Sequence, residues 1–180
     1  MMMNGSGEPS RTGYGVEVTI MAFRASRVLR IFELVTLSWV WLASCSHSSA
    51  VSERSTILES SQLSRTLKQC SRNTPKGVEG PAEISIEVAR RIDSDLESKE
   101  PPSVIAAVIP SPGRYYRQYI GVRMQGPDYV YINAFASTVP PSLRWRTLAS
   151  VACDGGRDYW GVRYDPSTGI YDQMAVNNVF

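Results

Sequence analysis

The sequence predicts an α+β domain in which one amphipathic helix packs on an antiparallel sheet of five to six strands. Three observations lead to this prediction. Apolar residues recur every four positions between Pro81 and Leu96; from Val104 onward the apolar runs are continuous or alternating; and short segments rich in proline and glycine separate those runs. The helical pattern comes first and the strand patterns follow, which is typical of this fold class.

The expected helix begins at Pro81, because proline is favoured in a first turn and Glu83 then lies where a carboxylate interacts well with the helix dipole. Its apolar side is formed by Ile84, Val88, Ile92 and Leu96, and its polar side by Glu87, Arg90, Arg91, Asp93 and Asp95. Residues 99–102, Lys-Glu-Pro-Pro, end it. Such a helix packs its apolar side on another element.

The expected strands are short and are separated by turn-forming residues. They span 104–109, 115–124, 129–135, 145–153, 159–164 and 170–176. Residues 119–123 and 159–163 share four of five residues, Tyr-x-Gly-Val-Arg. Two copies do not make a repeat protein, but they indicate two hairpins that are used alike.

The N-terminal part of the chain reads as a secretion signal. Three arginines at positions 24, 27 and 30 precede an apolar run over 34–42, and Ala43, Ser44 and Cys45 follow it. The run is shorter than the roughly 20 residues that a membrane-spanning helix needs. The alternative is a core helix with an ordinary buried thiol at Cys45. Residues 1–20 fit neither pattern, so translation starting at Met21 is a further expectation.

Residues 42–45, Leu-Ala-Ser-Cys, resemble the lipobox of bacterial lipoproteins. The resemblance implies that Cys45 is the lipid-attachment residue and carries a diacylglyceryl group and an acyl chain such as palmitate. It also implies that residues 21–44 are a cleaved signal peptide. Because Ser46 is not aspartate, it implies sorting to the outer membrane, facing the periplasm. Residues 45–80, rich in polar residues, are expected to be a flexible tether, within which Ile57, Leu58, Leu63 and Leu67 suggest one short amphipathic helix. Residues 81–180 are expected to be the domain.

Charge and cysteine content limit the function classes. The 19 basic and 17 acidic residues nearly balance, which gives no argument for a nucleic-acid partner. With Cys45 lipidated, Cys70 and Cys153 remain as an even pair in a compartment that permits disulfides. Whether they pair or stay two separate thiols is open.

The sequence offers little for catalysis. The only histidine, His47, lies two residues after Cys45, which excludes Ser-His-Asp and Cys-His arrangements and an ordinary zinc site in the domain. No cofactor motif is present, so neither a cofactor nor a metal is expected. The carboxylates of Asp154, Asp158 or Asp172 would suit general acid and base catalysis on a sugar, or would bind a calcium ion together with carbonyl groups. Asp154 and Asp165, however, also stand where aspartate caps turns.

A candidate binding face follows from the two-residue period of strands. It comprises Tyr115, Arg117, Tyr119, Arg123, Tyr159 and Arg163, which fall on one side of their strands if the aliphatic side is core. Tyrosine and arginine are favoured where proteins bind partners or sugar rings. Ordinary cross-strand pairs on a solvated face are the alternative interpretation.

Several motifs in the C-terminal half resemble a group of uncharacterised bacterial envelope proteins and lipoproteins. They lie at 116–122, 129–135, 154–156, 160–166 and 177–178, and the resemblance covers about 114–180. The chain departs from the group at Ala134, Ala136 and Asn178, where the group has Gly, Cys and Gly. The resemblance implies an envelope protein and brings no activity with it. With the lipobox and the candidate binding face, we expect a lipid-anchored binding or structural module whose partners are the membrane and an envelope protein or cell-wall glycan. A carboxylate-dependent glycan hydrolase of the periplasm is the alternative.

Overall fold

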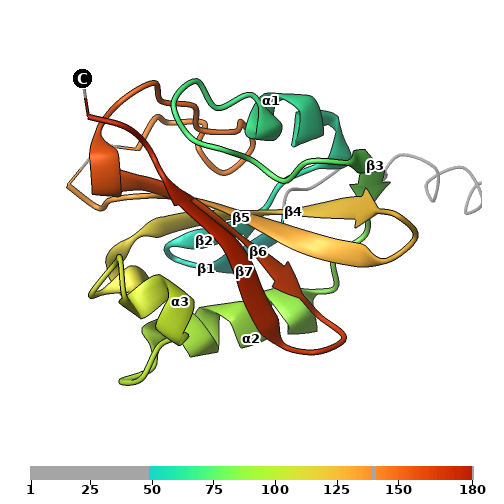
Figure 1. Ribbon diagram of the computed structural model, residues 1–180, viewed down its shortest axis with the longest axis horizontal. Coiled ribbons are helices and arrows are strands. Elements are labelled where there is room, and N and C mark those ends of the chain that lie inside the picture. The colour runs from blue at the N-terminus through green and yellow to red at the C-terminus, as the bar shows by residue number, and fades with distance from the viewer. Residues whose placement is uncertain (1–48, 139–140, 180) are drawn as a thin grey trace, which may run out of the picture. The chain divides into compact units, whose positions relative to one another are not determined.

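Seven strands form one sheet in the computed structural model, which describes residues 49–138 and 141–179 (Figure 1). The strands are β1 Ser49–Ser52, β2 Ser55–Ile57, β3 Val78–Ala82, β4 Tyr116–Met124, β5 Asp128–Phe135, β6 Tyr159–Asp165 and β7 Ile170–Val176. The helices are α1 Leu63–Leu67, α2 Ile86–Glu97 and α3 Ser103–Ala106, with short 3₁₀ turns η1 Ser60–Gln62, η2 Pro112–Arg114 and η3 Gly156–Asp158. The α+β prediction is confirmed.

The sheet order is β1-β2-β4-β5-β6-β7, and β3 pairs with β4 beside β2. Strand β4 is long enough to hold two neighbours on one edge: β2 lies parallel to it along Arg117–Tyr119, and β3 lies antiparallel along Gly121–Met124. The remaining described pairs are antiparallel. Strand β4 therefore organises the N-terminal half of the fold.

Both faces of the sheet are covered, α2 and α3 lying on one side and α1 on the other (Figure 1). Beneath α2 and α3, one buried cluster includes Ile92, Leu96, Ile105, Tyr119, Ile132 and Trp160. On the α1 side, a second cluster includes Leu58, Ile120, Val122, Tyr131 and Ala149. Successive residues of β4 alternate between the two clusters, as a two-residue period requires. Among the described residues, no helix is long and apolar enough to cross a membrane.

The predicted tether is wrong for residues 49–80, which contain β1, β2, α1 and part of β3. Its polar residues are used inside the fold: Ser55 and Thr56 of β2 are fully buried. The Ser55 hydroxyl donates to Asp93, and the Thr56 hydroxyl donates to the carbonyl oxygen of Arg146 at 3.2 Å. A strand whose hydroxyls are satisfied by the protein does not need an apolar sequence. The signal segment, Cys45 and residues 1–20 lie outside the described residues.

The predicted helix exists but begins later than expected. Helix α2 begins at Ile86, and its N-cap Ser85 accepts a hydrogen bond from the Val88 amide at 3.3 Å. Pro81 instead lies in β3, opposite Val122. Proline is tolerated at such an edge strand because its missing N–H can face away from the ladder.

Two predicted strands, 104–109 and 145–153, are also wrong. The first forms α3 and the turn after it, where Ile105 and Ile109, spaced four apart, are both fully buried. The second is irregular, and its carbonyl groups at Trp145 and Leu148 accept hydrogen bonds from the Gln118 amide. A short apolar run does not by itself distinguish a strand from a helical turn.

Strands β4 and β6, which carry the two Tyr-x-Gly-Val-Arg copies, flank β5 on either side. Each copy uses its glycine for a close approach. A Cβ at Gly121 would lie 2.1 Å from the Ala82 carbonyl oxygen, and one at Gly161 would lie 2.2 Å from the Tyr131 hydroxyl. In both copies, glycine is therefore required because another group lies too close to the strand to leave room for a side chain.

Candidate functional site

The predicted Tyr-Arg face is wrong as a surface at Arg117 and Tyr119, because helix α2 covers these two residues. Arg117 and Tyr119 have no exposed area, although they do share one side of β4 as the period predicts. Tyr115 is half-buried: its ring meets Trp160 edge-on at 5.7 Å, and its hydroxyl donates to the Arg157 carbonyl oxygen. The aliphatic side of β4 was expected to be core and the other side exposed, whereas both sides of this strand pack against other elements.

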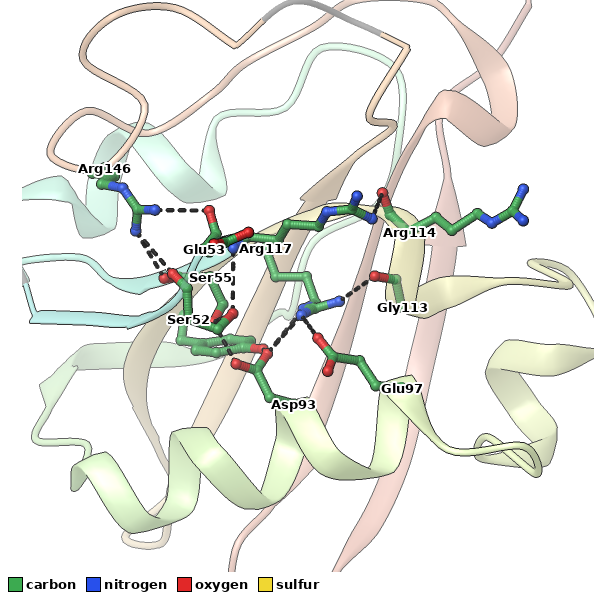
Figure 2. Close-up of polar contacts among 11 residues, drawn as sticks. Ser52, Glu53, Ser55, Asp93, Glu97, Gly113, Arg114, Arg117 and Arg146 are labelled. Carbon is green, nitrogen blue, oxygen red and sulfur yellow. Dashed lines mark hydrogen bonds and ion pairs between the residues drawn. The ribbon is translucent and has the colours of Figure 1, made fainter.

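Arg117 lies at the centre of a polar group, here called the Arg117 cluster, which also contains Ser55, Asp93 and Glu97 (Figure 2) and Tyr119. All of these residues are buried except Glu97, whose side chain is half exposed. Its Nε donates to Asp93 Oδ1 at 3.0 Å, and its Nη2 lies 2.9 Å from the same oxygen. Nη2 also pairs with Glu97 Oε1 at 2.5 Å. Asp93 additionally accepts hydrogen bonds from the hydroxyls of Tyr119 and Ser55. One carboxylate thus connects β2, β4 and α2.

The electrostatics of the Arg117 cluster follow from its burial. Burial raises the pKa of Tyr119 well above its usual value, and the charge of Asp93 and the hydrogen bond to it add to that increase. Burial alone would lower the pKa of Arg117, but its contacts with Tyr119, Asp93 and Glu97 outweigh burial and raise it. The Tyr119 hydroxyl accordingly donates to Asp93, and Arg117 forms ion pairs with Asp93 and Glu97.

Two shallow grooves meet at the exposed end of the Arg117 cluster. One, of about 400 Å³, lies between the end of α2 and the 110–114 segment; the other, of about 440 Å³, is lined by residues 52–54, and both include Glu97 and Gly113. Figure 2 shows Arg146 holding the β1–β2 turn through the carbonyl oxygens of Ser52, Glu53 and Ser55. Glu97, which borders both grooves, is paired with Arg117.

Arg123 and Arg163, the other arginines of the predicted face, have intramolecular partners. Arg123 pairs with the Asp128 carboxylate at 2.8 Å, which lowers the pKa of Asp128. Arg163 contacts both oxygens of the Asp172 carboxylate and lies over the Tyr129 ring at 4.3 Å. These contacts fit the alternative interpretation of cross-strand pairs. Tyr159, at the start of β6, is half-buried beside Gly155.

A second buried arginine, Arg72, lies on the α1 side of the sheet and was not anticipated from the sequence. It is 7% exposed, and its guanidinium donates to the Asn177 Oδ1 at 2.8 Å, the Tyr131 hydroxyl at 3.3 Å and the Asn133 Oδ1. Both asparagine side chains turn their oxygens toward Arg72 because their NH₂ groups donate to other acceptors. The Asn133 NH₂ group donates to the Gln118 side-chain oxygen and the Ser150 carbonyl oxygen. The Asn177 NH₂ group donates to the carbonyl oxygens of Ala152 and Asp154. Nothing in the local sequence around Arg72 distinguishes it from a solvated loop residue.

Cys70 and Cys153, whose pairing the sequence left open, form a disulfide across 83 residues. The bond joins the segment after α1 to the irregular segment 149–155, which also supplies the carbonyl groups bound by Gln69, Asn133 and Asn177. The disulfide and Arg72 therefore fix the same part of the chain to the sheet.

Two of the aspartates in the C-terminal third, Asp165 and Asp172, are held by neighbouring residues. Asp172 is held by Arg163, and Asp165 accepts from the backbone and hydroxyl of Ser167 within its own turn. The Asp165 side chain caps the turn as the sequence suggested, and these hydrogen bonds lower its pKa. Across 49–138 and 141–179, no three His, Cys, Asp or Glu side chains gather in a way that would hold a metal ion.

Comparison with protein-family models, curated proteins and solved structures finds no match for this chain.

Proposed function

We propose that this chain is a lipid-anchored protein of the bacterial cell envelope, held at the outer membrane through Cys45. Its α+β domain then acts as a binding or structural module on the periplasmic side. The observation that carries the proposal is the Cys70–Cys153 disulfide in a chain whose N-terminal part reads as a secretion signal. Structural disulfides persist in oxidising compartments such as the periplasm and are rare in the cytosol. Two separate parts of the chain thus point to the same compartment.

The disulfide also suits a small exported domain energetically. In the chain-entropy model, closing a loop of this length removes unfolded-state entropy worth roughly 4 to 5 kcal/mol. The bond anchors the 68–78 segment, which carries the buried Arg72. This covalent link stabilises the folded state of a small domain that folds outside the cytosol.

A binding or structural role is favoured over catalysis by how the charged groups are used. The buried Asp93 receives hydrogen bonds from three side chains, and Asp165 and Asp172 are occupied by their own neighbours. A catalytic carboxylate pair needs one member free to donate a proton and another free to act as base or nucleophile. Of the hydrolase candidates Asp154, Asp158 and Asp172, Asp172 is bound by Arg163 and is not free for either role.

Metabolic labelling with an alkyne-tagged palmitate tests the anchor. Cells would express the wild-type chain, the Cys45→Ser variant, and a Cys70→Ser/Cys153→Ser variant that keeps Cys45. The wild type and the double variant are expected to carry the label in the membrane fraction, and Cys45→Ser to carry none. Equal labelling of Cys45→Ser and the wild type would contradict the proposal, as would an unlabelled wild type in the soluble fraction.

A further inference from the structure

A basic groove lies on the α1 side of the domain and has no part in the networks of Arg117 and Arg72. It has a volume of about 460 Å³ and is lined by Ser61, Ser64, Arg65, Lys68 and Val151. Two hydroxyl groups and two cationic side chains thus surround one space, and no carboxylate lines it. Glu59 lies at the rim, where its carboxylate accepts a hydrogen bond from Ser61 at 3.4 Å. Hydroxyl donors combined with lysine and arginine are the groups that bind phosphate.

The groove is held in shape from both walls. Arg65 donates its Nε to the Ala149 carbonyl at 2.9 Å, while its two terminal amino groups have no hydrogen-bond partner among the described residues. The Cys70–Cys153 disulfide joins the two walls just beyond the groove, two residues after Lys68 on one side and two after Val151 on the other. The backbone segments that carry Arg65, Lys68 and Val151 are therefore linked on both sides of the groove, and both cations line the same space.

The groove lies close in the fold to the start of β1. Strand β1 begins at Ser49, only four residues after Cys45, so the two Cα atoms can be no more than about 14 Å apart. Ser49 pairs with Ile57 at the end of β2, and η1 and α1 follow directly after β2. Because β1 and β2 are antiparallel, the first residue of β1 and the last residue of β2 lie at the same end of this hairpin. The chain that comes from Cys45 and the chain that continues to α1 therefore meet the hairpin at that end.

These observations point to a surface that meets the membrane. A 35-residue tether would have let the domain move far from the bilayer, whereas four residues hold it at the surface. Bilayers containing anionic phospholipids attract nearby lysine and arginine side chains. Val151, which is 36% exposed in the same groove, suits the apolar region just below the headgroups.

We propose that the groove formed by Ser61, Ser64, Arg65, Lys68 and Val151 binds the phosphate of an anionic phospholipid in the membrane that holds Cys45. The inference rests on the proposed function, because the lipid on Cys45 brings the groove to the bilayer. Headgroup binding adds a second attachment that orients the domain. In other membrane-anchored proteins, a basic patch adds in the same way to the attachment by an acyl chain.

Amine footprinting of the acylated protein tests this proposal. The wild-type protein is reconstituted into phosphatidylcholine vesicles with or without phosphatidylglycerol and treated with an amine-reactive reagent; labelling of Lys68, Lys76 and Lys99 is then measured by mass spectrometry. Lys68 labelling is expected to fall at least about three-fold in the anionic vesicles while Lys76 and Lys99 change little. An Arg65→Ala variant should lose this protection, and an Arg91→Ala variant, which removes an exposed arginine of α2, should keep it.

Each alternative outcome has a distinct reading. Equal Lys68 labelling in both kinds of vesicle, in protein that floats with them, overturns the headgroup site and leaves the lipid anchor standing. Protection of Lys68 by inorganic phosphate in a neutral detergent, as strong as that by phosphatidylglycerol, overturns the membrane assignment in favour of a soluble anion. Protein that does not float with either vesicle contradicts the anchor itself, and this inference falls with it. Retention of the Cys70–Cys153 disulfide in Arg65→Ala checks that the variant is folded.

Discussion

Arg117 and Asp93 form an ion pair at 2.9 Å in which the arginine side chain has no exposed area and the aspartate side chain only 10%. A buried pair of this kind is costly to break, because removing one partner leaves an uncompensated charge in the interior. The pair also links the helix to the centre of the sheet. We therefore regard it as the main polar constraint on the position of α2.

Replacing Arg117 should test that role. Arg117→Met leaves the Asp93 carboxylate buried without its cation and is expected to lower the free energy of unfolding by about 3 kcal/mol or more, measured by urea denaturation. The double variant Arg117→Met/Asp93→Leu removes both charges and should recover part of the loss. Arg123→Met, which breaks the exposed pair with Asp128, serves as the control and should have little effect. A single-variant effect no larger than this control would contradict the account.

Arg72 should matter as much as a core residue although it lies in a loop. Arg72→Ala leaves the oxygens of Asn133 and Asn177 without their donor, and the expected loss is about 2 kcal/mol or more. The measurement is again urea unfolding, with the disulfide intact. Lys76→Ala, an exposed change in the same segment, should fall within about 0.5 kcal/mol of the wild type. Equal stability of the two variants would show that the Arg72 contacts contribute nothing.

The glycines of the repeated motif should differ in how well they tolerate alanine. Gly121→Ala places a Cβ against the Ala82 backbone carbonyl, which can move only if β3 leaves β4, so we expect loss of β3 pairing and a shift in Tm of many degrees. At Gly161 the obstacle is the Tyr131 side chain, so Tyr131→Leu should rescue part of the Gly161→Ala loss. Gly80→Ala, where a Cβ would meet nothing within 4 Å, is the control. Thermal unfolding of the set distinguishes these outcomes.

Two tyrosines should make the fold sensitive to alkali. Burial raises the pKa of Tyr119, and burial followed by the hydrogen bond to Asp95 raises that of Tyr171. A tyrosine with a raised folded-state pKa contributes stability that is complete below about pH 10 and declines above it, because the unfolded chain loses the proton first.

The decline should reach at most about 1.4 kcal/mol per pH unit for each such tyrosine. Urea unfolding between pH 9 and pH 11 is expected to show this loss, and Tyr171→Phe should reduce its slope. An identical slope in Tyr171→Phe and the wild type would mean that Tyr171 ionises as easily when folded as when unfolded.

The sequence predicted strands β4 to β7 well because local signals agree there. Residues alternate along these strands, and glycine- and proline-containing turns separate β4 from β5 and β6 from β7, so the strand bounds were correct to within one residue. In the longer segment between β5 and β6, by contrast, the strand expected at 145–153 is absent. Helix α2 was expected from its four-residue apolar repeat, and only its start was misplaced. These elements carry their own pattern and need little from distant residues.

The remaining parts depend on partners far away in the sequence. Strand β2 reads as polar because its hydroxyls bind Asp93 and the Arg146 carbonyl, 38 and 90 residues away. Arg117 reads as a surface residue until Asp93 of α2, 24 residues earlier, is placed beside it. The same applies to Arg72, whose acceptors lie on β5 and after β7. Side-chain burial on both faces of a sheet cannot be seen in the period of one strand.

The most direct test of the proposed function is the intact mass of the protein extracted from a membrane fraction, with free thiols blocked and no reductant added. The account predicts the mass of residues 45–180 plus a diacylglyceryl group and an acyl chain, less two hydrogens for the Cys70–Cys153 disulfide, with no blocking group attached. A soluble chain that retains residues 21–44, or a product with blocked thiols at both Cys70 and Cys153, would contradict it.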